Sequence, residues 1–145
     1  MLVEESGTLA DLRERVQAEA AGHFDVIHVT GHADVTDQGT PIFWLEDDVG
    51  QGKAAGANEL AAVFASKWPR LLFLSGCKTA RAPGQGAMPS LCEALVAAGA
   101  PAVLGWALPV GDRDASAVAA TLYDHLALGT SVAESVARAR GELIE

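Results

Sequence analysis

The chain has 145 residues, half of them hydrophobic, and a formal net charge of −9 from 19 acidic and 10 basic residues. This length suits one domain with a substantial core, and no apolar run approaches the roughly 20 residues of a membrane-spanning helix. The acidic balance and the scattered lysines and arginines argue against nucleic acid as a partner. Since no basic segment followed by an apolar one opens the chain, we expect no signal peptide. The 2 cysteines then indicate a reduced, cytoplasmic protein.

The first third of the chain begins with a predicted helix and a predicted strand. The helix ends near Gly22, because apolar residues recur at helical spacing at Leu9, Leu12, Val16 and Ala20. An apolar strand follows over residues 25–30. Turn signals at 37–39 and 49–52 then flank a short strand over residues 41–46, which predicts a hairpin projecting from the main sheet.

Helices and strands continue to alternate in the middle of the chain. A short helix should end before Trp68, since the residue before a proline disfavours the helical region. An uninterrupted apolar strand covers residues 71–76, as expected for a strand buried on both faces. Pro89 suits the first turn of the next helix and Gly99 its carboxyl end. Residues 102–106 form a third buried strand.

Two helices are predicted to close the chain. Asp112 can cap the first of them, which stops at Gly129. Ser131 and Glu134 have the spacing of a capping box for the second.

This order of elements predicts the α/β fold class. Strands that alternate with helices imply a mostly parallel sheet with right-handed crossovers and helices on both faces, which is a three-layer α/β/α sandwich, here with an added β-hairpin after the first core strand. Only three core strands are evident. We therefore expect that the single domain is a fragment of a larger protein, or that a sheet edge meets another subunit.

Cys77 and His32 are the side chains best suited to catalysis. Each comes directly after an apolar strand and a glycine. Open α/β sheets place reactive groups at the carboxyl ends of their strands, where the two side chains could meet. Lys78 and Arg81 supply positive charge that favours the nucleophilic thiolate, and a histidine can accept the thiol proton and later protonate a leaving amine.

Other cysteines and histidines are better explained by packing. A free cysteine usually behaves as a small hydrophobe, and we interpret Cys92 as a core residue of this kind. His28 lies inside its strand and is predicted to be a core histidine. No CxxC or HxxxH spacing supports a metal site, the glycines at 50–52 lack the context of a phosphate loop, and a GxSxG elbow is absent. We expect no metal and no cofactor.

Four blocks in the same order give the chain a resemblance to the CHAT domain family of caspase-like cysteine proteases, which are often attached to tetratricopeptide repeats. HVTGHA resembles the family's H-x-x-x-H-G pattern, and LSGCKTA resembles its L-S-x-C-x-T. The block from Ala98 through Trp106 to Asp112 is similar to its A-G-A…W-x-V-x-D segment, and the closing helix over residues 131–140 also fits.

The resemblance implies peptide-bond hydrolysis in a protein substrate. Cys77 would be the nucleophile and His32 the general base and acid. The backbone N–H groups of Cys77 and Ala33 would hold the oxyanion, and such donors are typically worth about 3–4 kcal/mol each in the transition state. A helical-repeat region or another regulatory partner would control the activity. Neither nucleic acid nor a membrane is expected as a partner.

Two positions depart from the family pattern. Ala33 replaces the glycine that usually follows the histidine, and it would be strained if the position required positive φ. Gly76 replaces a common alanine, a change that could loosen the strand end.

Substrate contacts and two other functions stay open from the sequence. Trp106 could wall a substrate pocket or pack in the core, and Asp112 could bind a basic side chain or cap its helix. The first alternative function is a catalytically silent binding or assembly module of the same fold. The second is an unrelated small α/β enzyme with a reactive thiol.

Overall fold

The computed structural model describes residues 3–76, 90–107, 109–141 and 143. The chain divides into two compact units, Met1–Leu108 and Pro109–Glu145. The first unit contains the described strands and three helices, and the second contains two helices.

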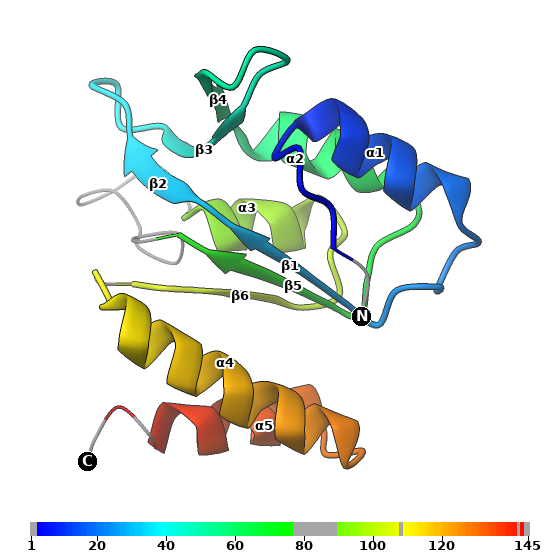
Figure 1. Cartoon of the computed structure of the whole chain (residues 1–145), viewed down its shortest axis with the longest axis vertical. Coiled ribbons are helices and arrows are strands. Elements are labelled where there is room, and N and C mark those ends of the chain that lie inside the picture. Colours follow the sequence, from blue (N-terminus) through cyan, green and yellow to red (C-terminus); the bar gives the residue numbers. More distant parts are fainter. Residues whose placement is uncertain (1–2, 77–89, 108, 142, 144–145) are drawn as a thin grey trace. The chain divides into compact units, whose positions relative to one another are not determined.

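A parallel sheet forms the centre of the first unit. It contains β1 (Val26–Thr30), β5 (Leu71–Ser75) and β6 (Val103–Gly105), in the order β1-β5-β6, as Figure 1 shows. The three predicted core strands and their parallel arrangement are therefore confirmed. The central strand, β5, is buried along Leu71 to Leu74, as its uninterrupted apolar run predicts.

Three helices pack against one face of this sheet. They are α1 (Leu9–Ala18), α2 (Ala57–Phe64) and α3 (Leu91–Ala97), which lie together above the sheet in Figure 1. Their buried side chains form one cluster with Leu72 and Leu74 of β5. The first unit thus supplies one helical layer, and the protein has a mixed α/β fold. The predicted three-layer sandwich is not confirmed.

A separate antiparallel sheet follows β1 directly. It contains β2 (His32–Val35), β3 (Pro41–Glu46) and β4 (Gly52–Ala55), in the order β2-β3-β4. The predicted hairpin is confirmed, but its first strand begins earlier than expected. Only Gly31 separates β1 from β2, so His32 opens a new strand instead of lying in a loop after the old one.

The second unit is a pair of packed helices, α4 (Asp112–Ala127) and α5 (Val132–Gly141). Gly111 is the N-cap of α4, so the prediction that Asp112 caps this helix is wrong. Asp112 lies instead in the first turn, where its negative charge still interacts favourably with the helix dipole.

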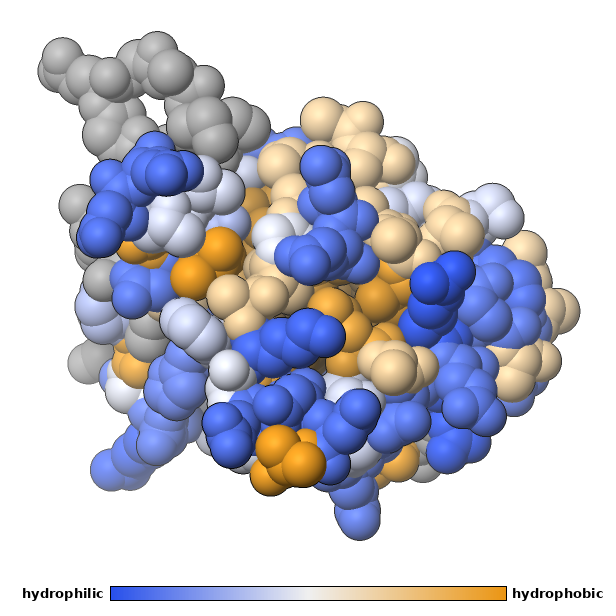
Figure 2. Space-filling model, turned by 90° about the horizontal axis from the view of Figure 1, so that it is seen from above, coloured by the Kyte–Doolittle hydropathy of each residue, from blue (hydrophilic) through white to orange (hydrophobic). Residues whose placement is uncertain are grey.

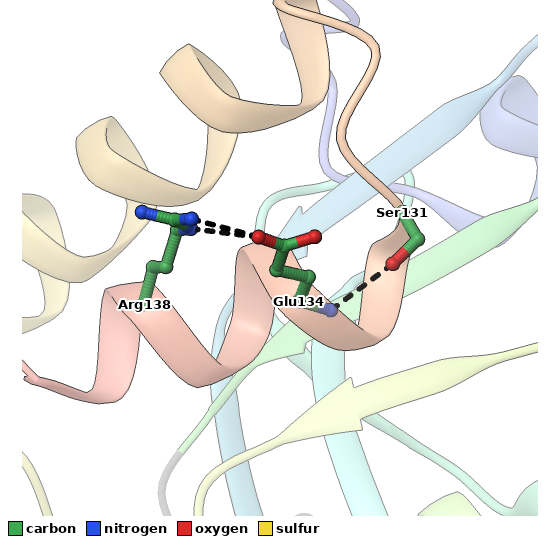
Figure 3. Close-up of polar contacts among 3 residues, drawn as sticks. All are labelled: Ser131, Glu134 and Arg138. Carbon is green, nitrogen blue, oxygen red and sulfur yellow. Dashed lines mark hydrogen bonds and ion pairs between the residues drawn. The ribbon is translucent and has the colours of Figure 1, made fainter.

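The N-terminus of α5 contains half of the predicted capping box. The Glu134 amide donates to Ser131 Oγ over 3.3 Å (Figure 3). The Glu134 carboxylate, however, accepts from Arg138 over 2.7 Å, one turn along the helix. The ion pair with Arg138 therefore takes the place of the second capping contact.

A complete capping box starts α3. Ser90 is the N-cap, its hydroxyl accepts from the Glu93 amide over 3.2 Å, and the Glu93 carboxylate accepts from the Ser90 amide over 2.7 Å. The hydrogen bond from the Ser90 backbone lowers the pKa of Glu93. Pro89, which we expected in the first turn, lies outside the described residues.

His28 differs from its predicted role as a core histidine. Its ring stacks on Phe73, with the two ring centroids 4.3 Å apart, but the residue remains partly exposed at the sheet surface. Partial burial lowers the pKa of the imidazole, since the charged form is less well solvated there. The neutral form is therefore favoured in the folded protein.

The surface of the first unit is mixed in polarity. Figure 2 views the side that carries α1 and the β3–β4 hairpin, where apolar residues are interrupted by hydrophilic ones. Among the described residues, no helix is both long and apolar enough to cross a membrane.

Lys67 and Gln17 tie α1 to α2. The Lys67 ammonium donates to the carbonyl oxygens of Gln17 and Glu19, over 2.6 and 2.7 Å, at the carboxyl end of α1. The Gln17 side chain donates in turn to the carbonyl oxygens of Val63 and Phe64 at the end of α2. The carbonyl groups at the end of α1 thus accept hydrogen bonds from Lys67, and those at the end of α2 accept them from Gln17.

We expect Lys67→Met to lower the free energy of unfolding by about 1–3 kcal/mol, because it leaves the last carbonyl groups of α1 without a charged donor. Urea unfolding at constant pH measures the change. Lys53→Met, at an exposed position of β4, is the matched control and should have little effect. Equal stability of the two variants would contradict this role of Lys67.

Candidate active site at the junction of the two sheets

The ends of β1 and β5 meet at two glycines. The paired residues of these strands run from Val26 with Leu71 to Thr30 with Ser75, each pair 45 positions apart. Gly31 then donates its amide hydrogen to the Ser75 carbonyl oxygen over 3.4 Å. Gly31 and Gly76 therefore lie side by side, directly before His32 and Cys77. Cys77 itself lies outside the described residues.

The ring of Phe43 fills the space that these two glycines leave. A Cβ atom on Gly31 would lie 2.7 Å from Phe43 Cε1, and one on Gly76 would lie 2.6 Å from Phe43 Cε2. Phe43 is fully buried and belongs to the core cluster. Glycine at position 76 is therefore required by close packing. This gives it a role other than the loosening expected from the sequence.

His32 stands at the first position of β2 with an exposed side chain. It pairs with Trp44 across the antiparallel ladder. Directly opposed residues of such a ladder present their side chains on the same face, about 4.5–5.5 Å apart at Cβ. The imidazole is therefore accessible to solvent on the outward face of the antiparallel sheet, beside Trp44.

Ala33 is unstrained. It lies within β2, opposite Phe43, and among the described residues Ala65 is the only non-glycine residue with positive φ. The expected cost of alanine at position 33 is thus absent. The Ala33 nitrogen lies 3.2 Å from the place of a Cβ atom on Gly76, so this backbone amide stands next to the end of β5.

Trp106 comes directly after β6 and is partly buried. Its indole N–H donates to Ser75 Oγ over 3.3 Å, and its ring centroid lies 6.0 Å from that of Phe73. Trp106 therefore lies beside Ser75, at the carboxyl end of β5. Ser75 comes two positions before Cys77 in the sequence. Asp112, in the second unit, is exposed. A contact of either residue with a substrate stays a prediction.

Cys92 is a packing residue, as predicted. It lies on α3 and is only 8% exposed. In the part of the chain that the structure describes, no group of three or more histidine, cysteine, aspartate or glutamate side chains could hold a metal ion.

Comparison with known families gives one match. The sequence model of the CHAT domain matches residues 1–145. The chain belongs to the CHAT domain family. The family is caspase-like, and its match covers the two strand ends that carry His32 and Cys77. Searches among curated proteins and among solved structures give no match.

Phe43 and Trp44 are the residues of this site that the sequence analysis missed. The strand over residues 41–46 was predicted, but not which of its side chains would face the glycines. The signal was the alternation within this strand, in which Phe43 and Leu45 are buried whereas Trp44 and Glu46 are exposed. In this CHAT domain, Phe43 packs against the glycines at the strand ends, and Trp44 lies opposite His32.

We expect Gly76→Ala to lower the free energy of unfolding by about 1–3 kcal/mol, because the added methyl group must displace the buried Phe43 ring. Denaturant unfolding monitored by circular dichroism measures the loss. Gly52→Ala is the matched control, since a Cβ atom there would make an ordinary 3.5 Å contact with Trp44. A Gly76→Ala variant as stable as the control would show that Phe43 does not hold the strand end.

Proposed function

We propose that this CHAT domain is a cysteine endopeptidase that cleaves a protein substrate through a Cys77–His32 dyad. The observation that supports it most strongly is the register of β1 and β5. Paired residues of the two strands are 45 positions apart, and 45 positions also separate His32 from Cys77. The glycine before His32 donates its amide hydrogen to the carbonyl oxygen of Ser75, the residue before Gly76.

The distances involved suit a dyad. Neighbouring strands lie about 4.8 Å apart, and successive Cα atoms are 3.8 Å apart. The proposal needs no more than these spacings, because the thiol and the imidazole each follow one of two neighbouring glycines. Catalytic contacts of this kind are often loose before substrate binds.

The proposed reaction proceeds through a thioester. His32 accepts the Cys77 proton, and the thiolate sulfur attacks the carbonyl carbon of the scissile peptide bond. The backbone N–H groups of Cys77 and Ala33 would stabilise the oxyanion. The C–N bond then breaks as His32 protonates the leaving amine. Water, with His32 as its base, attacks the thioester, releases the acid product and restores the thiol.

The unstrained Ala33 weighs against a catalytically silent module. That alternative drew support from the expected cost of replacing glycine at this position. Since Ala33 adopts ordinary strand geometry and its nitrogen lies beside Gly76, the position remains suitable for an oxyanion donor.

Several wider features belong to the same proposal. One of them is a three-layer, caspase-type sandwich over residues 1–145. Trp106 and Asp112 are proposed to contact substrate. A helical-repeat region or another regulatory protein would control the activity. A nucleophilic thiol must remain reduced, which suits the cytoplasm.

The dyad predicts unusual reactivity of Cys77. A free thiol with an ordinary pKa of about 8.5 is only a few per cent thiolate at pH 7, so pairing with His32 should raise its alkylation rate by roughly tenfold or more. We expect Cys77 to react with iodoacetamide that much faster than a peptide thiol, as measured site by site by mass spectrometry. His32→Ala should abolish the difference.

Two comparisons control this experiment. His23→Ala removes an exposed histidine outside the site and should leave the rate unchanged. Buried Cys92 should react slowly in every variant. A Cys77 thiol that reacts like a peptide thiol, with or without His32, would rule out the dyad in this chain.

A further inference from the structure

The outward face of the antiparallel sheet carries an exposed tryptophan beside the proposed general acid. Trp44 is 39% exposed, and it is the one aromatic residue among the exposed large hydrophobic side chains of the described residues. It occupies the central strand of the sheet, with His32 directly opposite on β2 and Ala54 on β4.

The indole ring of Trp44 lies against Gly52 of β4. A Cβ atom on Gly52 would lie 3.5 Å from Trp44 Cε3 and 3.9 Å from Cζ3, so the ring rests next to a residue without a side chain. The small Ala54 is the direct neighbour on the same strand. Neither Gly52 nor Ala54 has a side chain large enough to cover the indole ring.

We infer that Trp44 forms the subsite for the substrate residue that follows the scissile bond, and that this subsite prefers a large apolar or aromatic side chain. The inference rests on the proposed function. The inference goes beyond that function by assigning a specificity-determining residue on the leaving-group side of the scissile bond.

The direction follows from the chemistry of His32. To protonate the leaving amine, the imidazole must lie within about 3 Å of that nitrogen. The nitrogen belongs to the residue after the scissile bond, so the side chain of this residue starts beside His32. Trp44 Cβ lies about 5 Å from His32 Cβ on the same face, which is within reach of a large side chain but not of a glycine or an alanine.

The preference can be measured without knowing the natural substrate. An activated ester such as p-nitrophenyl acetate would acylate Cys77, with loss of p-nitrophenolate. An added amine then attacks the thioester carbonyl carbon, so that a C–N bond forms, the C–S bond breaks, and His32 takes the amine proton. This step reverses the expulsion of the leaving amine, so the captured amine occupies the same subsite.

We expect phenylalaninamide to be captured about 2–10-fold better than glycinamide at equal concentration, in keeping with the worth of an aromatic contact. Trp44→Ala should bring the ratio of the two amide products close to one, whereas Trp44→Phe should keep the preference. Val49→Ala removes another exposed hydrophobic residue and should leave the ratio unchanged. Chromatography of the two acetylated amides measures the ratio.

The outcomes separate the two proposals. Failure to acylate Cys77, seen as no mass increase on its peptide, would overturn the proposed function and this inference with it. Acylation followed by equal capture of the two amides, or a preference that persists in Trp44→Ala, would overturn the inference alone.

Discussion

The packing of the Phe43 ring against Gly31 and Gly76 is the contact on which the proposed site depends. The ring comes from the antiparallel sheet, whereas Gly76 directly follows the central strand of the parallel sheet and Gly31 links the two sheets. Because protein interiors tolerate little overpacking, a buried ring held this closely fixes the separation of both chain segments. The two residues that carry the proposed chemistry come next in sequence after these glycines.

Both three-stranded sheets contribute to the proposed active site. The parallel sheet supplies the register, in which paired positions of β1 and β5 differ by 45. The antiparallel sheet supplies the immediate surroundings of His32, since β2 starts at this residue and β3 places Trp44 opposite it. Rigid strands on both sides favour catalysis because little reorganisation is needed when substrate binds.

Much of the fold could be predicted from the sequence, because uninterrupted apolar runs and helical spacing mark the strands and helices directly. The parallel strands β1 and β5, which precede His32 and Cys77, could also be predicted from their apolar runs. The role of Phe43 was not, because it depends on a contact between two sheets that no local pattern encodes. Strain at Ala33 was expected only if the position required positive φ, and this condition is not met: β2 starts at His32, and that pairing gives position 33 ordinary strand geometry.

The most direct test of the account is the proximity of residues 32 and 77 in the folded protein. In a Cys92→Ala background, His32→Cys should form a disulfide with Cys77 under mild oxidation, because bridged cysteines require Cα atoms within about 7 Å. Asp34→Cys, exposed on the same strand two residues further along, is the control and should form little disulfide. Mass spectrometry of the peptides gives the yield for each pair. Efficient bridging from position 32 alone is the predicted result, and equal or negligible bridging from both positions would contradict the proposed dyad.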